Sequence, residues 1–378
     1  MKILHLADTH LGFSAYRKLT NEGMNQRELD VYDSFIQCID YAVKSKPDIV
    51  LHAGDLFDSV RPNNRAITVA IQQVLRLSKK KIPFIVISGN HETPRLKGTG
   101  NIFSIFEHLE YVYPIYEDGY KTIEFKKKNK KTTVHAIPQC QTKEDFNNNL
   151  KKLEIDSNSD YNILMAHGSV SGIKEFKMNE FNELIIPSNI FVKGFDYIAL
   201  GHYHKFTKIK ENVFYSGSTE NLSFSDLGGS KGLIEIDLDK KINYSFIEIN
   251  NRSMIDSPPI DCLDLTVEEV FQKIKQNIDK IQPEGKIFRI RLFNIPSHVY
   301  RGLDFNQIRK ITKGSVHFEI KSDVLREGEL HISEDYKIES IASEFEKFLN
   351  KQKITEKEEL LKLGIEYIHR VELKDEGK

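Results

Sequence analysis

The sequence has few cysteines, no long apolar run and almost no net charge, and each of these features excludes a class of protein. Its 378 residues include three cysteines, Cys38, Cys140 and Cys262, with no C-x-x-C pair. Neither a disulfide framework nor a cysteine-based zinc site is therefore expected. No window approaches the roughly 18 apolar residues that a membrane span needs, and the first residues fit no signal peptide. We expect a cytoplasmic, intracellular protein without a membrane partner.

The balance of charge excludes a protein that is basic all over. Lys and Arg number 54 against 55 Asp and Glu, which leaves a formal charge of -1. An anionic partner must then be held by local positive charge or by metal ions. With 39% hydrophobic residues over this length, an ordinary globular chain of two or three domains is expected.

Apolar runs of strand length recur through the first two hundred residues, with helix-like segments between the early ones. These runs cover residues 3–7, 49–52, 84–87, 163–166 and 197–200. They are apolar throughout, which is typical of strands covered on both faces. Hairpin-like runs follow, at 121–125, 132–137, 213–216, 232–238 and 244–249. The order predicts an α/β fold, a β-sandwich flanked by helices.

Composition divides the chain into three parts. The stretch 250–259, which contains Ser257-Pro258-Pro259, has the composition of a linker after a first domain of residues 1–250. Residues 260–330 alternate helix-like and strand-like segments, so a small α/β module without a catalytic signal is expected. Residues 334–378 are charge-rich with apolar residues at helical spacing. This C-terminal helical segment could fold back onto the body or dock onto a partner.

Five short polar motifs each begin where an apolar strand is expected to end. They are Asp8-Thr9-His10, Gly54-Asp55, Gly89-Asn90-His91-Glu92, His167-Gly168 and Gly201-His202-Tyr203-His204. Each motif alone is a weak signal, because Asp-x-His arises by chance and Gly-Asp is a common turn. Ligands of open α/β sheets bind at the carboxyl ends of strands, so all five can converge. Together they predict a single site.

Seven side chains of these motifs are nitrogen and oxygen donors suited to metal ions. They are Asp8, His10, Asp55, Asn90, His167, His202 and His204. Seven ligands are too many for one ion and suit two ions that share a carboxylate, for which Asp55 is the best bridge. Two such cations clamp the attacking and leaving oxygens of a phosphoryl displacement. Without a thiolate, the ligands suit Mn, Fe or Zn.

His91 immediately follows the predicted ligand Asn90, and adjacent side chains can diverge. Its ring is then free to face the substrate. An imidazole beside two metals can donate a proton to the leaving oxygen, so we expect His91 to be the general acid. The alternative is that His91 only hydrogen-bonds the backbone.

The five motifs, in this order, resemble those of the calcineurin-like metallophosphoesterase superfamily. Within it, residues 6–12 (LADTHLG), residues 54–58 (GDLFD) and Arg61-Pro62 are similar to the nuclease subunit of the double-strand-break repair complex, the Mre-eleven/SbcD family of archaeal type. The resemblance is strong over residues 1–250 and weaker through residue 330. In the C-terminal segment it rests only on position in the chain.

The resemblance implies a ligand set, an activity and partners. One Mn²⁺ ion would be held by Asp8, His10, Asp55 and His204, and the second by Asp55, Asn90, His167 and His202, with His91 as the catalytic acid. The implied activity is a Mn-dependent 3'-to-5' exonuclease on double-stranded DNA and an endonuclease on single strands and hairpins. The implied partners are DNA, a second copy in a homodimer and an SMC-like coiled-coil ATPase. Residues 1–250 would be the nuclease domain, 260–330 a DNA-binding capping domain, and 334–378 the segment that docks the ATPase.

Two positions depart from the family pattern. Asp58 stands where the family often has His, which leaves open the balance of exonuclease and endonuclease activity. Glu92 stands where Asp is more usual, and we expect it to orient a neighbour of the metal ligands.

The residues themselves support DNA only modestly, because a metallophosphoesterase could equally cleave small phosphoesters. A further alternative is a mainly structural scaffold that holds DNA ends. Basic side chains in loops near the motifs favour DNA and would contact phosphates without reading sequence. They are Arg17, Lys18, Arg27, Arg61, Arg65, Arg95 and Lys97. The alternative is a scatter of solvated charge.

A short apolar segment offers a surface for dimerisation. Its apolar residues are Ile102, Phe103, Ile105, Phe106 and Leu109, more than one face of a short helix needs. We expect a contact between protomers here, and the alternative is a buried core helix.

Overall fold

The structure is a computed structural model of the 378-residue chain. It describes residues 1–117, 119–127, 129–172, 183–239, 242–325, 345–346, 349–350 and 357–375. Within these residues, no helix is both long and apolar enough to cross a membrane.

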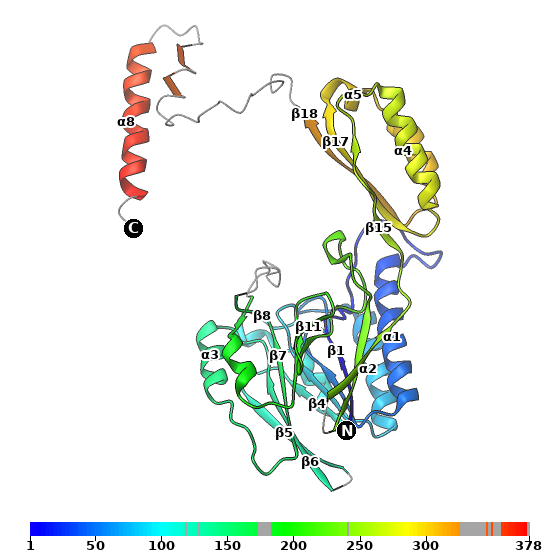
Figure 1. The fold of residues 1–378 in the computed structure, drawn as a ribbon, viewed down its shortest axis with the longest axis vertical. Coiled ribbons are helices and arrows are strands. Elements are labelled where there is room, and N and C mark those ends of the chain that lie inside the picture. The colour runs from blue at the N-terminus through cyan, green and yellow to red at the C-terminus, as the bar shows by residue number, and fades with distance from the viewer. Residues whose placement is uncertain are drawn as a thin grey trace.

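Two six-stranded sheets form the body of the molecule (Figure 1). The first has the order β14-β13-β1-β2-β3-β4, with β1 Lys2–Leu6, β2 Ile49–His52, β3 Phe84–Ile87, β4 Val112–Ile115, β13 Gly232–Leu238 and β14 Ile242–Glu248. The second has the order β11-β12-β10-β7-β6-β5, with β5 Lys121–Lys127, β6 Lys130–Ile137, β7 Tyr161–His167, β10 Tyr197–Gly201, β11 Thr207–Lys210 and β12 Val213–Tyr215. The predicted sandwich is confirmed.

The two sheets face each other, and helices cover their outer faces. The described residues of the body include the α-helices α1 Gln26–Ser45, α2 Asn64–Lys79 and α3 Lys143–Lys151. Alternate residues of β1 point to opposite cores: Leu4 packs toward α1 and α2, whereas Ile3 packs between the sheets. Residues of the second sheet divide in the same way between the middle core and the core under α3. Strands buried on both faces explain the uniformly apolar runs.

Local signals fix where the helices begin and end. The side chain of Asn25 accepts hydrogen bonds from the main-chain N–H groups of Arg27 and Glu28, at 2.9 and 3.3 Å, and so caps α1. The same helix ends at Lys46, which adopts a left-handed conformation just before Pro47. Asn63 caps α2 by accepting from the N–H of Ala66.

A four-stranded sheet forms the centre of a separate small module. Its strands are β15 Met254–Asp256, β16 Ile260–Asp261, β17 Ile287–Pro296 and β18 His317–Leu325, and its helices are α4 Val267–Ile281, α5 Ser297–Gly302 and α6 Phe305–Ile311. All strand pairs are parallel, and a core of its own includes Phe288 and Ile274. The boundaries 1–250, 260–330 and 334–378 remain predictions.

Short elements complete the described chain. They are the pair β8 Ser169–Val170 and β9 Ile185–Ile186, the 3₁₀ helices η1 Lys97–Thr99, η2 Ile102–Phe106, η4 Ser188–Val192 and η5 Phe224–Asp226, and the helix α8 Lys357–Asp375. Residues 334–344 of the predicted C-terminal helical segment, which include Ile338 and Ile341, lie outside the described residues.

The predicted dimer segment requires a correction. Phe103 and Phe106 lie in η2 and are fully buried in the core under α1 and α2. Their rings pack on Phe57, with centroids 6.3 Å from it in each case, so they are not available to a second protomer. The apolar surplus of the segment serves this core. Half-buried residues are left at the surface: Ile102, Ile105 and Leu109.

Candidate metal centre

The five polar motifs meet at one edge of the sandwich. In the first sheet β1, β2 and β3 run parallel, so the residues that follow them, Asp8, Asp55 and Asn90, emerge side by side. In the second sheet β7 and β10 are also parallel, and His167 pairs with Gly201 just before His202. Main-chain hydrogen bonds join the loops. The N–H of Asp8 donates to the carbonyl of Gly54, and the N–H of His10 donates to the main-chain carbonyl of Asp55, each at 3.0 Å.

The backbone at this edge is strained. Four of the predicted ligands, none of them glycine, have positive φ angles: Asp8 52°, His10 47°, Asp55 53° and His202 100°. Such conformations cost about 1–3 kcal/mol each and persist where the surrounding structure enforces them. All four side chains belong to the donor groups described below.

Two glycines are needed for close approach. A Cβ on Gly54, whose φ is +100°, would lie 2.2 Å from Nδ1 of His167. A Cβ on Gly89 would lie 2.1 Å from Oδ1 of Asp55. The Gly-Asp and Gly-Asn pairs of the sequence are therefore packing requirements of the site.

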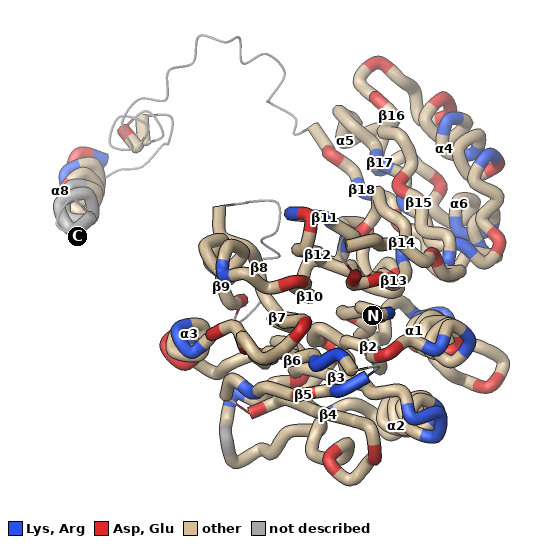
Figure 2. Tube along the Cα trace, turned by 60° about the horizontal axis from the view of Figure 1, so that its bottom comes forward, with Lys and Arg blue, Asp and Glu red and all other residues tan. Residues whose placement is uncertain are grey.

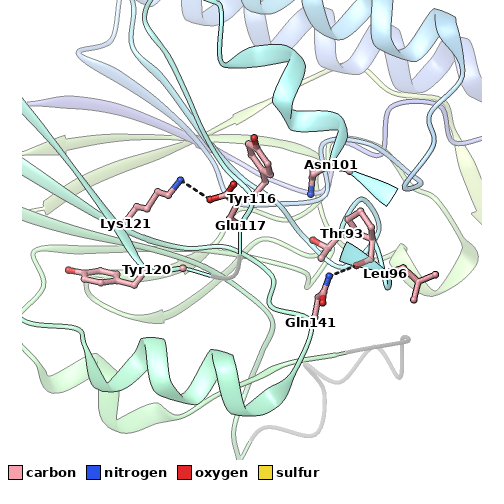
Figure 3. A pocket seen from close by; sticks show the side chains of 11 residues that line it. Thr93, Leu96, Asn101, Tyr116, Glu117, Tyr120, Lys121 and Gln141 are labelled. Carbon is pink, nitrogen blue, oxygen red and sulfur yellow. Dashed lines mark hydrogen bonds and ion pairs between the residues drawn. The ribbon is translucent and has the colours of Figure 1, made fainter. Parts of the chain in front are cut away.

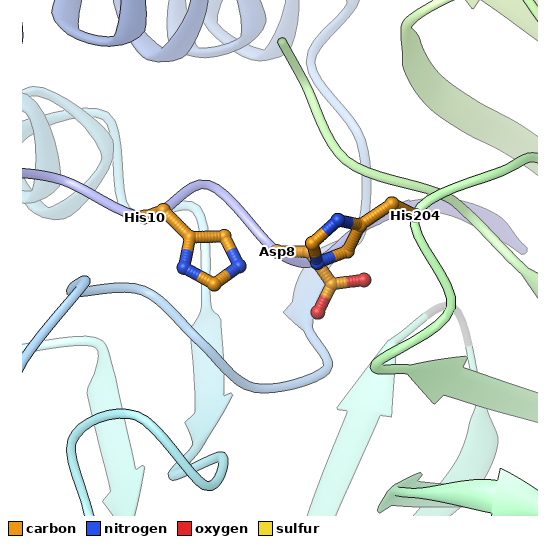
Figure 4. Close-up of side chains that lie close together, drawn as sticks. All are labelled: Asp8, His10 and His204. Carbon is orange, nitrogen blue, oxygen red and sulfur yellow. The ribbon is translucent and has the colours of Figure 1, made fainter. Parts of the chain in front are cut away.

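The first group of donors consists of Asp8, His10 and His204, shown in Figure 4. One ligand atom from each lies within 4.8 Å of the others, and all three residues are buried. His10 and His204 come from different sheets, and their ring centroids are 5.1 Å apart. This group can hold one cation.

The second group consists of Asp55, His167 and His202, with Asn90 at its centre. Oδ1 of Asn90 lies 3.0 Å from Nε2 of His167 and 3.2 Å from Nδ1 of His202. Nε2 of His167 is also 3.2 Å from Oδ2 of Asp55. Ligands bound at about 2.1 Å to one ion at right angles lie about 3 Å apart, so these spacings suit a single coordination sphere.

In each of the four histidines, the ring nitrogen that points away from the donor group (the outer nitrogen) lies close to an oxygen atom. The pairs are His10 Nδ1 with Asp58 Oδ1 at 3.2 Å, His167 Nδ1 with the Ala53 carbonyl at 2.9 Å, His202 Nε2 with Glu183 Oε1 at 3.2 Å, and His204 Nδ1 with Asp226 Oδ1 at 3.2 Å. An outer N–H that donates to oxygen leaves the inner nitrogen as a lone pair for a metal. The histidines would thus bind through Nε2, except His202 through Nδ1.

Charge at the site is organised around Asp55. Burial opposes ionisation of Asp55, but the adjacent His167 ring holds the pKa of this carboxyl well below its usual range. Burial likewise opposes charge on His167, but Asp55 and Asp8 outweigh it and raise the pKa of His167 to about 9. The ring is thus positively charged at neutral pH, with a proton on both nitrogens, and a bound cation would displace one of these protons.

Buried polar atoms with few partners test whether the site fits metal ions. Among the described residues, Nε2 of His10 is buried without a hydrogen bond, and Oδ2 of Asp55 is buried with only the ion pair to Nε2 of His167 at 3.2 Å. Such atoms are costly unless something binds them. They lie 3.9 Å apart on the side between the two donor groups. The residues fit a pair of cations, one at each donor group.

His91 lies beside the first group. Its main-chain N–H donates to Oδ1 of Asp55 at 3.0 Å, and Nδ1 of its ring lies 3.0 Å from the carbonyl of Asp58. Because a carbonyl only accepts, Nδ1 carries the hydrogen. The ring centroid is 4.5 Å from that of His10, yet the side chain is 28% exposed whereas His10 is 1% exposed. His91 is therefore the imidazole on the open side of the site.

Two carboxylates around the site, Glu183 and Asp226, carry roles that the sequence motifs did not assign. They hold His202 and His204, and neither follows a predicted strand. Burial opposes charge on Asp226, but His204 lowers the pKa of Asp226 to about 2. Glu92 is fully buried and accepts from the N–H groups of Leu56 and Gly89, at 3.2 and 3.1 Å, so it braces the loops that carry the ligands.

Arg27 requires a correction, because it is fully buried and cannot contact DNA. Its guanidinium donates to Asp30 at 2.7 Å and to the carbonyl of Asn221 at 2.5 Å. The carboxylate of Glu220 lies 3.6 Å away. Charge alone predicted a surface position, whereas these acceptors compensate the buried cation.

The other basic residues predicted to bind DNA lie mostly at the surface. Arg17, Lys18, Arg61, Arg65 and Arg95 are exposed, whereas the side chain of Lys97 lies outside the described part. Arg65 is paired with Glu28 at 3.4 Å. Figure 2 shows basic and acidic positions interspersed along the trace.

Two neighbouring hollows lie beside the loops that follow β2 and β3. Arg61 and Arg95 both line a hollow of about 400 Å³. A second hollow of about 570 Å³ shares Pro94 and Leu96 with it and extends to Tyr116 and Lys121 (Figure 3). Pro94 and Leu96 follow His91 closely in the chain, but neither hollow is lined by His91 or by a predicted metal ligand.

Known proteins match this chain over most of its length. The family model described as calcineurin-like phosphoesterase matches residues 1–206. A protein of Sulfolobus acidocaldarius called DNA double-strand break repair protein Mre11 is 30% identical over 74% of this chain and 72% of its own length. The chain belongs to the Mre11/SbcD family of calcineurin-like phosphoesterases.

Other members of the Mre11/SbcD family match to a similar extent. A Methanococcus maripaludis protein of the same name is 29% identical over 76% of each chain, and an SbcCD nuclease subunit of Staphylococcus epidermidis is 28% identical over 79% of this chain and 80% of its own. Membership makes the chain a metal-dependent phosphodiesterase with the dinuclear metal site of its superfamily. The expected family, fold class and enzyme class are confirmed.

Proposed function

We propose that this protein is a Mn-dependent DNA nuclease that processes double-strand breaks. Its activities would be a 3'-to-5' exonuclease on double strands and an endonuclease on single strands and hairpins. It would act as a homodimer together with an SMC-like coiled-coil ATPase. The relatives named for DNA double-strand break repair and as an SbcCD nuclease subunit support the choice of DNA over small phosphoesters.

One observation carries the proposal: seven donors from five strand ends converge as two groups, and Oδ2 of Asp55 in the second group lies 3.9 Å from Nε2 of His10 in the first. Asp8, His10 and His204 with Asp55 would hold one ion, and Asn90, His167 and His202 with Asp55 the other. A bound pair of ions supplies Lewis-acid stabilisation of the phosphoryl oxygens and a water nucleophile at neutral pH.

The protein's own residues supply orientation and a proton. Asp58 and Asp226 hold the rings of His10 and His204 in one tautomer, so the inner nitrogens need no reorganisation. His91, fixed through Nδ1 on the carbonyl of Asp58, directs Nε2 away from that contact. In its protonated form, Nε2–H would donate to the leaving 3' oxygen.

Phosphates of the DNA backbone would be held near this edge. Arg61 and Arg95 line one hollow from the two loops that follow Asp55 and Asn90, which suits a phosphate placed beside the ions. Arg17 and Lys18 are exposed on the loop after β1. Such contacts are independent of base sequence, as end processing requires.

Two apolar surfaces would serve the protein partners. Helix α8 exposes Leu360, Leu363 and Tyr367 to 41%, 54% and 60%, which suits docking of coiled-coil helices. For the homodimer, half-buried residues of and beside η2 remain, namely Ile102, Ile105 and Leu109.

A labelled-end assay tests the proposal. Linear duplexes carrying a 3' or a 5' label are incubated with Mn²⁺, with Mg²⁺ or without metal, beside a chromogenic phosphodiester. We expect loss of the 3' label first, only with Mn²⁺. Turnover of the small phosphodiester with intact duplex would contradict a DNA nuclease and favour a metabolite phosphodiesterase.

The variant His91→Ala tests the acid. We expect it to keep both ions in a calorimetric titration and to lose about 10²- to 10⁴-fold in cleavage rate. The exposed His108 offers a matched control, His108→Ala, which should cleave normally. Cleavage by His91→Ala at the unmodified rate would rule out the general-acid role.

A further inference from the structure

A buried lysine lies behind the predicted ligand His204. Lys231 immediately precedes β13 and is 2% exposed. Removing an ammonium group from water is costly unless strong hydrogen bonds replace the lost hydration. The position therefore calls for a role that an apolar side chain could not fill.

The contacts of Lys231 point to the main chain of His204. Nζ donates to the carbonyl of His204 at 2.6 Å and to the hydroxyl of Ser218 at 2.9 Å. The N–H of Ser218 donates to the same carbonyl at 3.2 Å. The main chain of His204 is thus held by a charged donor and by a neutral one, and the charged bond is the stronger.

The ring of His204 is held from the other side. Oδ1 of Asp226 accepts from Nδ1 of His204, and Oδ2 of Asp226 accepts from the N–H groups of Leu222 and Ser223 at 2.9 Å each. The carboxylate therefore cannot turn without losing three hydrogen bonds. Ring and main chain of His204 are each anchored to the stretch 216–226.

That stretch is itself fixed to the body, although it lies between strands. Ser216, Ser218, Thr219 and Glu220 are almost fully buried. Arg27 of α1 donates to the carbonyl of Asn221 in the middle of this stretch. Buried and bonded to α1, the stretch is a rigid support rather than a loose loop.

We propose that Lys231 is a positioning residue that holds His204 in place for the first metal ion through the His204 carbonyl. The inference rests on the proposed function, because it takes His204 as a metal ligand. Lys231 contacts no residue of the second group in the described structure, so its effect should be confined to one of the two ions.

The variant Lys231→Met tests this role, since Met fills the same buried volume without a donor. We expect calorimetric titration with Mn²⁺ to show one site weakened about 10- to 100-fold and the other unchanged. Electron paramagnetic resonance at limiting Mn²⁺ should then show an uncoupled ion. Lys231→Gln keeps an N–H donor and should recover part of the affinity.

Controls separate the possible outcomes. The exposed Lys313 offers a matched variant, Lys313→Met, which should bind both ions normally. If Lys231→Met does not fold, Ser218→Ala, which removes one partner of Nζ, should weaken the same site to a smaller extent. Unchanged Mn²⁺ binding, or equal weakening of both sites, in a folded variant would overturn the proposal. Failure of the proposed function would appear instead in the unmodified protein, as fewer than two ions bound or no DNA cleavage.

Discussion

The body and the small module are built in the same way, yet only one of them carries a candidate metal centre. Both pair parallel strands over apolar cores. Among the described residues, the groups of acids and histidines able to hold a metal ion all lie in the body. In the module, the charged residues of the sheet neutralise one another, as Arg289 does with Asp256 at 2.6 Å. Parallel strand ends alone therefore do not make a site.

The difference lies in burial and strain. At the body's edge, acids and histidines are almost fully buried on a left-handed backbone, as at Asp8 and Asp55. That arrangement costs free energy unless cations compensate it. The module contains no comparable buried set among its described residues, and its stability rests on apolar packing.

The largest expected effect comes from removing the bridge. Asp55→Ala should lose both ions, because we propose that both ions share this carboxylate, and cleavage should fall on the order of 10⁴-fold, about 5.5 kcal/mol. Mn²⁺ calorimetry and the duplex assay measure both losses. Asp237→Ala, on the exposed far side, serves as control. Retention of two ions would show that Asp55 is not the bridge.

A substitution in the core of the small module should lower its stability and leave Mn²⁺ binding unchanged. Phe288 is fully buried, and its ring packs on Phe318 with centroids 4.9 Å apart. Phe288→Ala should destabilise the module by about 3–5 kcal/mol while Mn²⁺ binding is kept. Unfolding monitored by hydrogen exchange would locate the loss. If Mn²⁺ binding vanished as well, the two regions would not be separable.

A smaller effect is expected where a glycine lets the ligands approach. Gly89→Ala places a Cβ within 2.1 Å of Oδ1 and 2.6 Å of the main-chain nitrogen of Asp55. The shift of Asp55 should weaken Mn²⁺ binding about 10- to 100-fold. Gly98→Ala meets no atom within 4 Å and provides the control. Equal affinity in both variants would contradict the packing role.

The smallest effect concerns a buried histidine away from the edge. His5 bonds the hydroxyl of Tyr197 at 2.8 Å, and burial lowers the pKa of His5 to about 3. Below about pH 6.5 the unfolded chain takes up a proton that the folded one refuses, so stability falls as pH drops toward 3. Urea unfolding should show about 2 kcal/mol more loss between pH 7 and 5 than in His5→Leu/Tyr197→Phe. Equal pH slopes would contradict this assignment.

The sequence could predict the parts of the site that are local. Asp8, Asp55 and Asn90 follow apolar runs directly, and parallel strands bring their ends together, so the convergence could be expected. The residues that hold the ligands in place could not be predicted. Asp226 and Lys231 are recognised only by the residues that the fold brings next to them. Arg27 and Phe103 show the same limit, because composition indicates a charged or apolar side chain but not which neighbours bury it.

Anomalous scattering from crystals grown with Mn²⁺ tests the central claim most directly. We predict two Mn²⁺ ions about 3.5–4 Å apart, with a carboxylate oxygen of Asp55 on both and the inner nitrogens of His10, His204, His167 and His202 divided between them. A single ion, or two ions that do not share Asp55, would contradict the account.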